Sequence, residues 1–479
     1  MPKRSLVRAA LFLSFGLGSI VAYQNCGGFS SLELASESGV APAPSATLRH
    51  GLDNPVMMSQ VASDQISQGT LPSAFGAALQ GNPYNPVGPK FRYLPDGARE
   101  AYRLGIKALK ITLALENLKM EENRPWMMQV NNVTGAQLDA LQSIVQVAEL
   151  PAYKYVLSLP FETLFIQTTE IGIADEASNY WKMSTVPLSQ AALNSIYQQH
   201  YEFGRYLLKK FKGTGRTFVL QDHEADWHAA IWIGAPTYYT ENTDIGHANY
   251  EKYWTLRQKA VDDAVRDEKS DVRLYNMCEV VRVRDSALSG GKSLTRDVLP
   301  KVTCDLIGYS AHDTAQINDG GATLAKAINY IRSKARVSPT FGQNQVILSE
   351  IAYTEVVNAS QPQLKDQIVN AMHGSIMKGM PWVLYWAFYD HENVGNYIVK
   401  SNNDFGLTFY AFLAKLGIAP QKLGAATTSW PSYVVPSSAP IVVPQIPTIP
   451  PLAPTQTPVP TVVPTTTPAP TVTPTPTAT

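Results

Sequence analysis

Acidic, imidazole and indole side chains gather in residues 222–228, directly after the largely apolar run 217–220. A second glutamate, Glu350, directly follows another largely apolar run, 346–349. Short runs of this kind are typical of strands buried on both faces. Two carboxyl groups held at the ends of buried strands can act on one substrate as a nucleophile and a proton donor. The question for the fold is therefore whether it brings Glu224 to Glu350.

Amphipathic helices and short apolar strands alternate between about residues 48 and 424. We expect seven helices, each followed by a strand, over residues 96–105, 136–150, 189–212, 250–266, 295–300, 322–335 and 363–378. A last helix over 408–416 closes the series. A regular alternation of this kind indicates parallel strands joined by crossover helices.

One further strand at the start, expected somewhere within 48–91, would make eight and predicts an α/β fold, a (β/α)8 TIM barrel. The alternative is a doubly wound open sheet. That fold would favour a Gly-rich phosphate-binding turn after the first strand, and the sequence shows no such turn. In a TIM barrel the active residues lie at the carboxyl ends of the strands. The fourth predicted strand leads to Glu224 and the seventh ends at Glu350, so both would lie at the same mouth.

Two carboxyl groups that face each other at about 5 Å suit hydrolysis of a glycosidic bond with retention of configuration. One attacks the anomeric carbon, while the other protonates the departing oxygen and then activates water. The two groups must differ in environment, so that one is ionised and the other protonated. We predict substrate contacts for six residues near the ends of the fourth, sixth and eighth strands: His223, Trp227, Tyr309, His312, Trp386 and Asp390. Aromatic rings pack well on sugar faces, although packing in a hydrophobic core is the alternative for both tryptophans.

The motifs "QDHEADW", "SEIAYTE" and "YWAFYDHEN" stand at the ends of the fourth, seventh and eighth strands. Glutamates at strands four and seven are the arrangement of the clan A glycoside hydrolases, and the chain resembles this 4/7 barrel superfamily through these short motifs. The resemblance implies that Glu224 is the acid/base and Glu350 the nucleophile of a retaining glycoside hydrolase. It also implies that Trp386 forms a platform under the bound sugar and that Tyr309 hydrogen-bonds the nucleophile.

Two positions depart from the pattern of the clan. An asparagine usually precedes the acid/base, and here that residue is His223. An arginine is common at the end of the second strand, where this chain offers Lys110, Glu116 and Asn117. A divergent hydrolase family is one explanation. The alternatives are a transglycosylase that uses the same carboxylates, or a non-catalytic carbohydrate-binding or structural barrel of the cell envelope.

No metal, cofactor or nucleic acid is expected. His223 and His228 are five residues apart, about 140° around a helix, whereas a zinc-protease helix needs histidines four apart. The sequence carries no P-loop and no G-x-S-x-G motif. Lys plus Arg and Asp plus Glu both number 39, so the charge does not indicate nucleic acid or an anionic membrane as a partner. The expected partner is a carbohydrate substrate.

Residues 1–26 resemble a bacterial lipoprotein signal. A basic start is followed by the apolar run 9–21, and Cys26 then precedes two glycines. The run is too short for a comfortable membrane span. We therefore expect an exported protein, anchored to the membrane through lipidation of Cys26. Ordinary secretion and an uncleaved anchor are the alternatives.

The remaining organisation follows from composition. Residues 27–47 are expected to be a linker, 48–424 the glycosidase-like barrel, and 425–479 a disordered tail rich in Pro and Thr. Cys278 and Cys304 both lie in strand-like runs. They are interpreted as buried thiols, with a disulfide between neighbouring strands as the alternative in an exported protein.

Overall fold

The computed structural model describes residues 54–79, 93–113, 124–170, 183–234, 238–356, 358–389, 395, 397–399, 404–423 and 432–435. The predicted signal with Cys26, the linker, Asp390 and nearly all of the predicted tail lie outside the described residues. The chain divides into two units, Met1–Pro444 and Gln445–Thr479, and the second also lies outside them. Within the described residues, no helix combines the length and the apolarity needed to cross a membrane.

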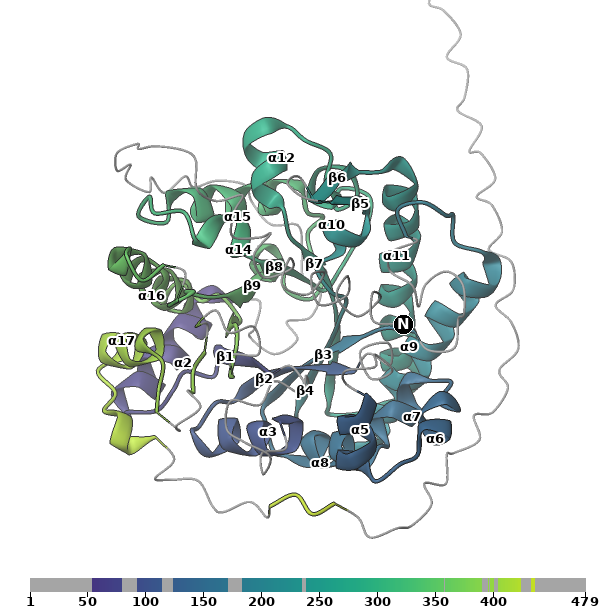
Figure 1. The fold of residues 1–479 in the computed structure, drawn as a ribbon, viewed down its shortest axis with the longest axis horizontal. Helices are drawn as coiled ribbons and strands as arrows, with labels where there is room; N and C mark the ends of the chain where they lie inside the picture. Colours follow the sequence, from purple (N-terminus) through teal and green to yellow (C-terminus); the bar gives the residue numbers. More distant parts are fainter. Residues whose placement is uncertain are drawn as a thin grey trace, which may run out of the picture. The chain divides into compact units, whose positions relative to one another are not determined.

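Eight parallel strands close into a barrel, which confirms the predicted (β/α)8 fold (Figure 1). Their order around the barrel is β1 (Phe75–Leu79), β2 (Ala108–Leu113), β3 (Thr163–Thr168), β4 (Thr217–Gln221), β7 (Arg273–Val280), β8 (Leu306–Ser310), β9 (Val346–Ile351) and β10 (Val383–Tyr385). The last strand pairs with the first, with Phe75 opposite Val383. Strand β1 lies in the expected window; its Gly and two Ala residues have weak strand propensity, which explains why it could not be placed.

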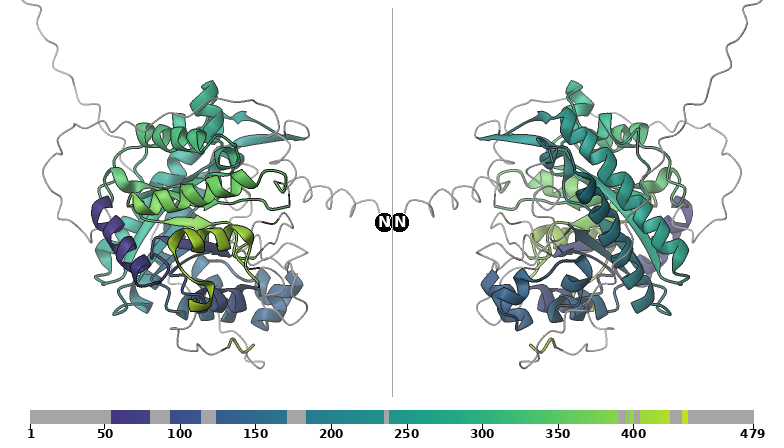
Figure 2. Two further views of the ribbon diagram at one scale, coloured as in Figure 1. Left: turned by 90° about the vertical axis from the view of Figure 1, so that its left-hand side faces the viewer. Right: turned by 90° about the vertical axis from the view of Figure 1, so that its right-hand side faces the viewer.

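Helices surround the strands, and the longer ones lie on the outside of the barrel (Figure 1). They are α2 (Pro55–Ser67), α3 (Tyr93–Arg103), α5 (Arg124–Asn131), α6 (Gly135–Asp139), α7 (Ile144–Ala148), α8 (Pro151–Ser158), α9 (Gln190–Lys210), α10 (Ala225–His228), α11 (Asp244–Asp267), α12 (Val283–Ser289), α13 (Leu294–Asp297), α14 (His312–Ala315), α15 (Ala322–Lys334), α16 (Pro362–Met377) and α17 (Leu407–Leu416), with short 3-10 turns at Gln343–Gln345 and Pro420–Lys422. The long helices α9 and α11 pack side by side (Figure 2). Each begins at a side-chain cap, Ser189 for α9 and Thr243 for α11.

One predicted helix, 136–150, is wrong, because two short helices, α6 and α7, cover this region and a third, α8, follows it. Thr134 caps α6 in a capping box with Gln137, Ser143 caps α7, and Pro151 begins α8. A side chain that accepts a backbone N–H, or a proline that lacks one, starts a new helix rather than continuing the old one. Apolar periodicity alone did not reveal these interruptions.

A two-stranded antiparallel hairpin follows α10, formed by β5 (Ala230–Gly234) and β6 (Tyr238–Asn242). The elements expected from the sequence include no strand here. Ile231 and Ile233 are exposed, as expected when alternate side chains of a strand point to the same face. The hairpin packs against α10, and so it stands beside the loop that carries Glu224 (Figure 1).

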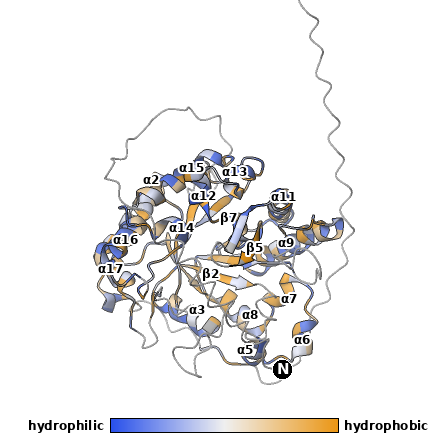
Figure 3. Ribbon diagram, turned by 45° about the horizontal axis from the view of Figure 1, so that its top comes forward, coloured by the Kyte–Doolittle hydropathy of each residue, from blue (hydrophilic) through white to orange (hydrophobic). Residues whose placement is uncertain are grey.

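The core has two apolar layers, one inside the barrel and one between the strands and the helices. Apolar residues dominate the strands, whereas the helices combine apolar and polar residues (Figure 3). Inside the barrel Trp382 packs edge-on against Phe165 and lies near Phe341, which fills the interior with side chains. Towards the carboxyl ends of the strands the interior side chains change from apolar to polar. On β2, for example, buried Ala108 is followed two residues later by buried Lys110.

Cys278 of β7 forms a disulfide with Cys304, which precedes β8. The interpretation of both residues as free buried thiols is therefore wrong, and the disulfide alternative is confirmed. Both residues are buried, and Cys278 stands next to the interior-facing residue Glu279. The bond joins residues that are 26 positions apart.

Replacing both Cys278 and Cys304 by alanine is expected to lower the free energy of unfolding by about 3 kcal/mol, because a cross-link of this span restricts the unfolded chain. Urea denaturation of the variant and of the oxidised protein measures the difference. Equal denaturation midpoints and slopes would show that the bond contributes nothing to stability.

Candidate active site

Glu224 stands three residues after β4, at the start of the short helix α10. Its backbone is left-handed, with φ 34° and ψ 53°, a conformation that is uncommon for residues other than glycine. The Glu224 N–H donates to Glu279 Oε2 at 2.9 Å. This bond helps to hold the backbone in the geometry that carries the Glu224 carboxyl group.

Glu350 is buried at the end of β9. Simple alternation from Ile347, which packs inside the barrel, would turn Ser349 inward and Glu350 outward. The pairing with β8 shifts at this point, however, so that Ser310 lies opposite Glu350. Such an irregularity re-aims the side chain that follows it. The Glu350 carboxylate consequently meets side chains from three other elements.

Those three contacts come from Lys110, Ser310 and His312. Lys110 Nζ lies 2.5 Å from Glu350 Oε1. Ser310 Oγ and His312 Nε2 each lie 3.2 Å from Glu350 Oε2. The nucleophile candidate is therefore surrounded by one ammonium group and two further polar groups.

Ser310 also links the two glutamates, because its hydroxyl donates to Glu224 Oε1 at 2.7 Å. One oxygen each of Glu224 and Glu350 and one nitrogen of His312 all lie within 4.8 Å of one another. This spacing is close to the separation of about 5 Å at which two carboxyl groups serve retaining glycoside hydrolysis. The fold thus brings together three of the residues that the sequence singled out.

The two glutamates differ in proton affinity. Burial raises the pKa of Glu224, and the negative charge of Glu350 raises it further. Burial also acts to raise the pKa of Glu350, but Lys110 and His312 outweigh that effect and hold it well below its ordinary value. The environment therefore favours a protonated Glu224 beside an ionised Glu350, the starting state that an acid and a nucleophile require.

Lys110 lies in the middle of β2 and is buried. Its ammonium group also lies 3.0 Å from Glu279 Oε1. Burial acts to lower the pKa of Lys110, yet Glu279 and Glu350 together raise it. Lys110, one of the three residues that the sequence offers in place of an arginine, thus supplies the positive charge beside the nucleophile candidate. Glu116 and Asn117 lie outside the described residues.

Trp386 is nearly buried, directly after β10. Lys110 Nζ lies 6.0 Å from the centre of its ring, and the ring of His312 lies 6.4 Å away, edge-on. The peptide bond between Trp386 and Ala387 is cis. Trp386 therefore stands beside the carboxylate pair, in a place consistent with a platform.

Trp227 and His223 lie on the Glu224 side of the site. The ring of Trp227 packs 4.8 Å from that of Tyr239, and the guanidinium of Arg282 lies 5.1 Å from it. Burial raises the pKa of Tyr239, and the nearby charge of Glu224 adds to the effect. The ring of His223 lies 5.9 Å from that of buried His228.

The expectation that Tyr309 hydrogen-bonds the nucleophile is corrected by the structure. Its hydroxyl donates to Asp313 Oδ1 at 2.6 Å and lies 2.6 Å from Thr314 Oγ1. The physical reason is alternation along β8: Ser310 points into the barrel, so its neighbour Tyr309 points outward. The hydroxyl group that contacts Glu350 is that of Ser310.

Sequence reasoning missed Glu279 and Ser310. Glu279 is fully buried on β7 and contacts both Lys110 and Gln221. A signal was present, since Lys110 and Glu279 each interrupt an otherwise largely apolar stretch of strand, and two buried opposite charges on a barrel interior favour a pair. Ser310 offered no comparable signal.

The oxygen atoms of Glu224 and Glu350 and a nitrogen of His312 are close enough to share a cation. The ammonium group of Lys110 already lies 2.5 Å from Glu350, and its charge opposes a second cation at the same carboxylate. The arrangement is therefore better suited to acid–base and nucleophilic chemistry, and the absence of a metal remains a prediction.

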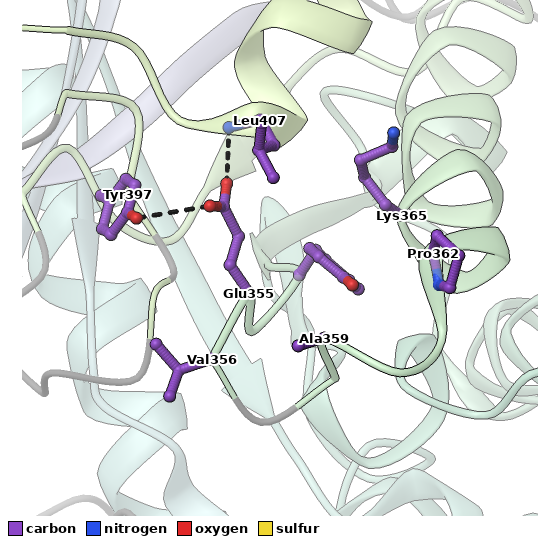
Figure 4. Close-up of a pocket in the computed structure, with 8 residues that line it drawn as sticks. Glu355, Val356, Ala359, Pro362, Lys365, Tyr397 and Leu407 are labelled. Carbon is purple, nitrogen blue, oxygen red and sulfur yellow. Dashed lines mark hydrogen bonds between the residues drawn. The ribbon is translucent and has the colours of Figure 1, made fainter.

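A pocket of about 330 Å³ lies beyond the end of β9 (Figure 4). Its lining includes Tyr353, Glu355 and Tyr397 but neither Glu224 nor Glu350. Glu355 accepts hydrogen bonds from Leu407 N at 2.5 Å and from Tyr397 at 3.3 Å. Glu355 thus caps the start of α17, which is a structural role.

No protein-family model matches the chain, and no curated protein matches it. Solved structures do match. Exo-beta-1,4-mannosidase Op5Man5 from Opitutaceae bacterium strain TAV5 is 11% identical with a TM-score of 0.42, over 74% of this chain and 60% of that one. A beta-glucosidase from Exiguobacterium marinum is 11% identical with a TM-score of 0.43, over 72% of this chain and 98% of that one. A GH5-4 broad specificity endoglucanase from Clostridium acetobutylicum is 10% identical with a TM-score of 0.40, over 74% and 99%.

These likenesses concern the fold, and this chain spans only 60% of the mannosidase's length. A barrel of this type hosts many unrelated activities. The side chains of the site itself therefore determine which chemistry this barrel can carry out.

Proposed function

We propose that the protein is a retaining glycoside hydrolase in which Glu350 is the nucleophile and Glu224 the acid/base. The observation that carries the proposal is the pairing of two nearby carboxyl groups with opposite pKa shifts. Proximity alone would also suit a structural carboxylate pair that shares a proton. The ammonium of Lys110 favours division of roles, because it contacts Glu350 directly and stabilises negative charge there.

In the first step the ionised Glu350 forms a bond to the anomeric carbon of the sugar. The bond from that carbon to the departing oxygen breaks, and the proton of Glu224 moves to this oxygen. In the second step the now ionised Glu224 takes a proton from water. The water oxygen bonds to the anomeric carbon, and Glu350 leaves with its electron pair.

Ser310 and His312 fit both steps. A single hydroxyl hydrogen can serve only one acceptor at a time, and Ser310 lies within reach of both carboxyl groups. It can therefore donate to whichever group carries the charge. His312 contacts the Glu350 oxygen that Lys110 does not contact. Both carboxylate oxygens of Glu350 therefore have a hydrogen-bonding partner when Glu350 leaves the anomeric carbon.

We further propose that the substrate is a polysaccharide or oligosaccharide met outside the cytoplasm. The signal-like start with Cys26 supports export. The disulfide between Cys278 and Cys304 supports it independently, because such bonds persist in oxidising compartments. Lipid anchoring at Cys26 is part of the same proposal.

The proposal is tested with 2,4-dinitrophenyl glycosides of the common hexoses and pentoses in both anomeric forms, together with the corresponding disaccharides. Proton NMR of the fresh product reports its anomeric configuration. We expect turnover on at least one glycoside, with retention. An inverted product, or binding without turnover across the panel, would overturn the proposal. Transfer of the glycosyl group to an added sugar in preference to water would assign a transglycosylase instead.

For a disaccharide, whose departing oxygen needs a proton, the pH dependence of kcat/KM is expected to be bell-shaped. The rate falls at low pH as Glu350 takes up a proton, and this limb lies at unusually acidic pH because the pKa of Glu350 is lowered. It falls at high pH as Glu224 loses its proton, and this limb lies above the ordinary range of a glutamate because its pKa is raised. A rate that stays flat from about pH 4 to pH 9 would contradict these roles.

A further inference from the structure

Glu279 is a third carboxylate in the site, and it takes no part in either step of the proposed mechanism. It is fully buried at the carboxyl end of β7. Its Oε1 lies 3.0 Å from Lys110 Nζ, and its Oε2 accepts the Glu224 N–H at 2.9 Å. One oxygen therefore contacts the cation that supports Glu350, and the other contacts the backbone that carries Glu224.

We propose that Glu279 is a positioning residue for both catalytic carboxyl groups. It holds the Lys110 ammonium group against the Glu350 carboxylate, and it fixes the left-handed backbone that carries the Glu224 carboxyl group. The expected changes in kcat and in the pH profile rest on the proposed hydrolase function. The geometric part of the inference stands on the contacts of Glu279 alone.

The first half of this role concerns Lys110. A lysine side chain is long and flexible, and a buried ammonium group needs acceptors for its N–H groups. Glu279 and Glu350 approach this ammonium at 3.0 and 2.5 Å. Without Glu279 the ammonium would keep only one charged partner, and its distance from Glu350 would no longer be fixed by two anchors.

The second half concerns Glu224. Its left-handed backbone stores free energy that the surroundings must offset. The hydrogen bond to Glu279 is charge-assisted, and such bonds are roughly twice as strong as neutral ones. Loss of this bond would release the Glu224 backbone and move its carboxyl group relative to Glu350. A displacement of about 1 Å can reduce an enzymatic rate about 100-fold.

Glu279 is itself held firmly. Its N–H donates to Asp222 Oδ1 at 2.7 Å, and Trp254 Nε1 donates to Asp222 Oδ2 at 2.5 Å. The adjacent residue Cys278 is cross-linked to Cys304. A carboxylate fixed in this way can impose a geometry on its partners, because it has little freedom to follow them.

Glu279 also contributes charge. The titratable groups around Glu224 come from several elements: Lys110 of β2, Tyr239 of β6, Glu279 of β7, His312 of α14 and Glu350 of β9, together with the neighbouring His223. The negative charge of Glu279 makes loss of the proton from Glu224 harder, and so raises the pKa of Glu224. Removal of this charge should shift the alkaline limb of the rate profile to lower pH.

The test is Glu279→Gln in the full chain, assayed with the disaccharide that gives the highest turnover, because its departing oxygen needs the proton of Glu224. Glutamine keeps the shape and one acceptor but removes the charge. We expect kcat to fall by about 10- to 100-fold with KM within about threefold, and the alkaline limb to move to lower pH. A second variant, Glu279→Asp, keeps the charge but cannot reach both partners. It should lose kcat while its alkaline limb moves less.

Asp305→Asn is the matched control. Asp305 is also a buried barrel carboxylate, but it stands before β8 and accepts from Asn276 N at 3.0 Å and from Gln258 at 2.9 Å. This variant should lose stability without a change in the rate profile. If Glu279→Gln and Asp305→Asn lose rate equally, with unmoved alkaline limbs, the positioning role is overturned.

A second readout does not depend on activity. Carbon-13 NMR of protein labelled at the glutamate carboxyl carbons follows the titration of Glu224, assigned by its loss in Glu224→Gln. We expect this titration at lower pH in Glu279→Gln, and an unmoved midpoint would overturn the inference. A shifted titration in a protein that hydrolyses no glycoside would overturn the proposed function while the positioning role stands.

Discussion

Replacing Glu350 by glutamine is expected to reduce kcat by at least about 10⁴-fold, while the barrel remains folded. An amide can neither attack the anomeric carbon nor leave as an anion, so the covalent route is lost rather than slowed. The change is nearly isosteric and keeps an acceptor for Lys110. Steady-state rates with the preferred aryl glycoside measure the loss of kcat. Circular dichroism measures whether the fold is retained.

Glu355→Gln is the matched control, since it makes the same chemical change five residues further along the chain. Glu355 accepts the backbone N–H of Leu407 and caps α17, away from the carboxylate pair. It should lose at most about 1 kcal/mol of stability and keep a kcat near that of the unaltered protein. Comparable losses of kcat in both variants would show that the Glu350 result reflects damage to the fold.

Replacing Lys110 by methionine is expected to lower kcat/KM at neutral pH by at least about 100-fold and to move the acid limb to higher pH. Because Lys110 no longer offsets the effect of burial, the pKa of Glu350 rises. The nucleophile is then protonated over part of the former working range. The pH dependence of kcat/KM checks both effects, and an acid limb that stays in place would contradict them.

The same variant should also lose about 3–5 kcal/mol of stability, because two buried carboxylates lose their shared cation. In the unaltered protein the pKa of Glu350 is lowered by folding, so its stabilising contribution is present above the unfolded pKa and is lost as pH falls. In the variant the pKa of Glu350 is higher than in the unaltered protein, so the deficit should grow as pH rises between the acid limbs of the two proteins.

Arg216→Met is the matched control for this effect. Arg216 is a buried cation next to the start of β4, where it donates to Phe161 O at 2.9 Å and to Leu157 O at 2.7 Å. Its replacement should cost stability without a shift of the acid limb. Denaturation at two pH values separates the two variants.

The architecture was predictable because it rests on repetition. Seven predicted helices, each followed by a strand, indicated the fold class. This held even though β1 carries too many small residues to be recognised as a strand. The local interruptions were harder to predict. Caps at Thr134 and Ser143 override the apolar period of 136–150, because a side chain that satisfies a helix terminus decides where that helix begins.

The site was predictable only in part. Strand ends identified Glu224 and Glu350, but alternation along β9 would have turned Glu350 outward, and only the shifted pairing with β8 turns it inward. Alternation also explains the wrong expectation for Tyr309, whose neighbour Ser310 takes the interior position. The contacts of Glu279 depend on which strands lie beside β7 and across from it in the closed barrel, and alternation along one strand does not report that. Trp227, His223 and Trp386 remain predicted substrate contacts.

The most direct measurement of the central claim is the mass of Glu224→Ala after mixing with a 2,4-dinitrophenyl glycoside. This leaving group departs without a proton, so Glu350 should still be glycosylated, but no base remains to activate water and the intermediate should accumulate. We predict a burst of dinitrophenol, a mass increase of one glycosyl group, and a modified peptide that places the group on Glu350. A burst with the group on another residue, or turnover with no adduct and an inverted product, would contradict the account.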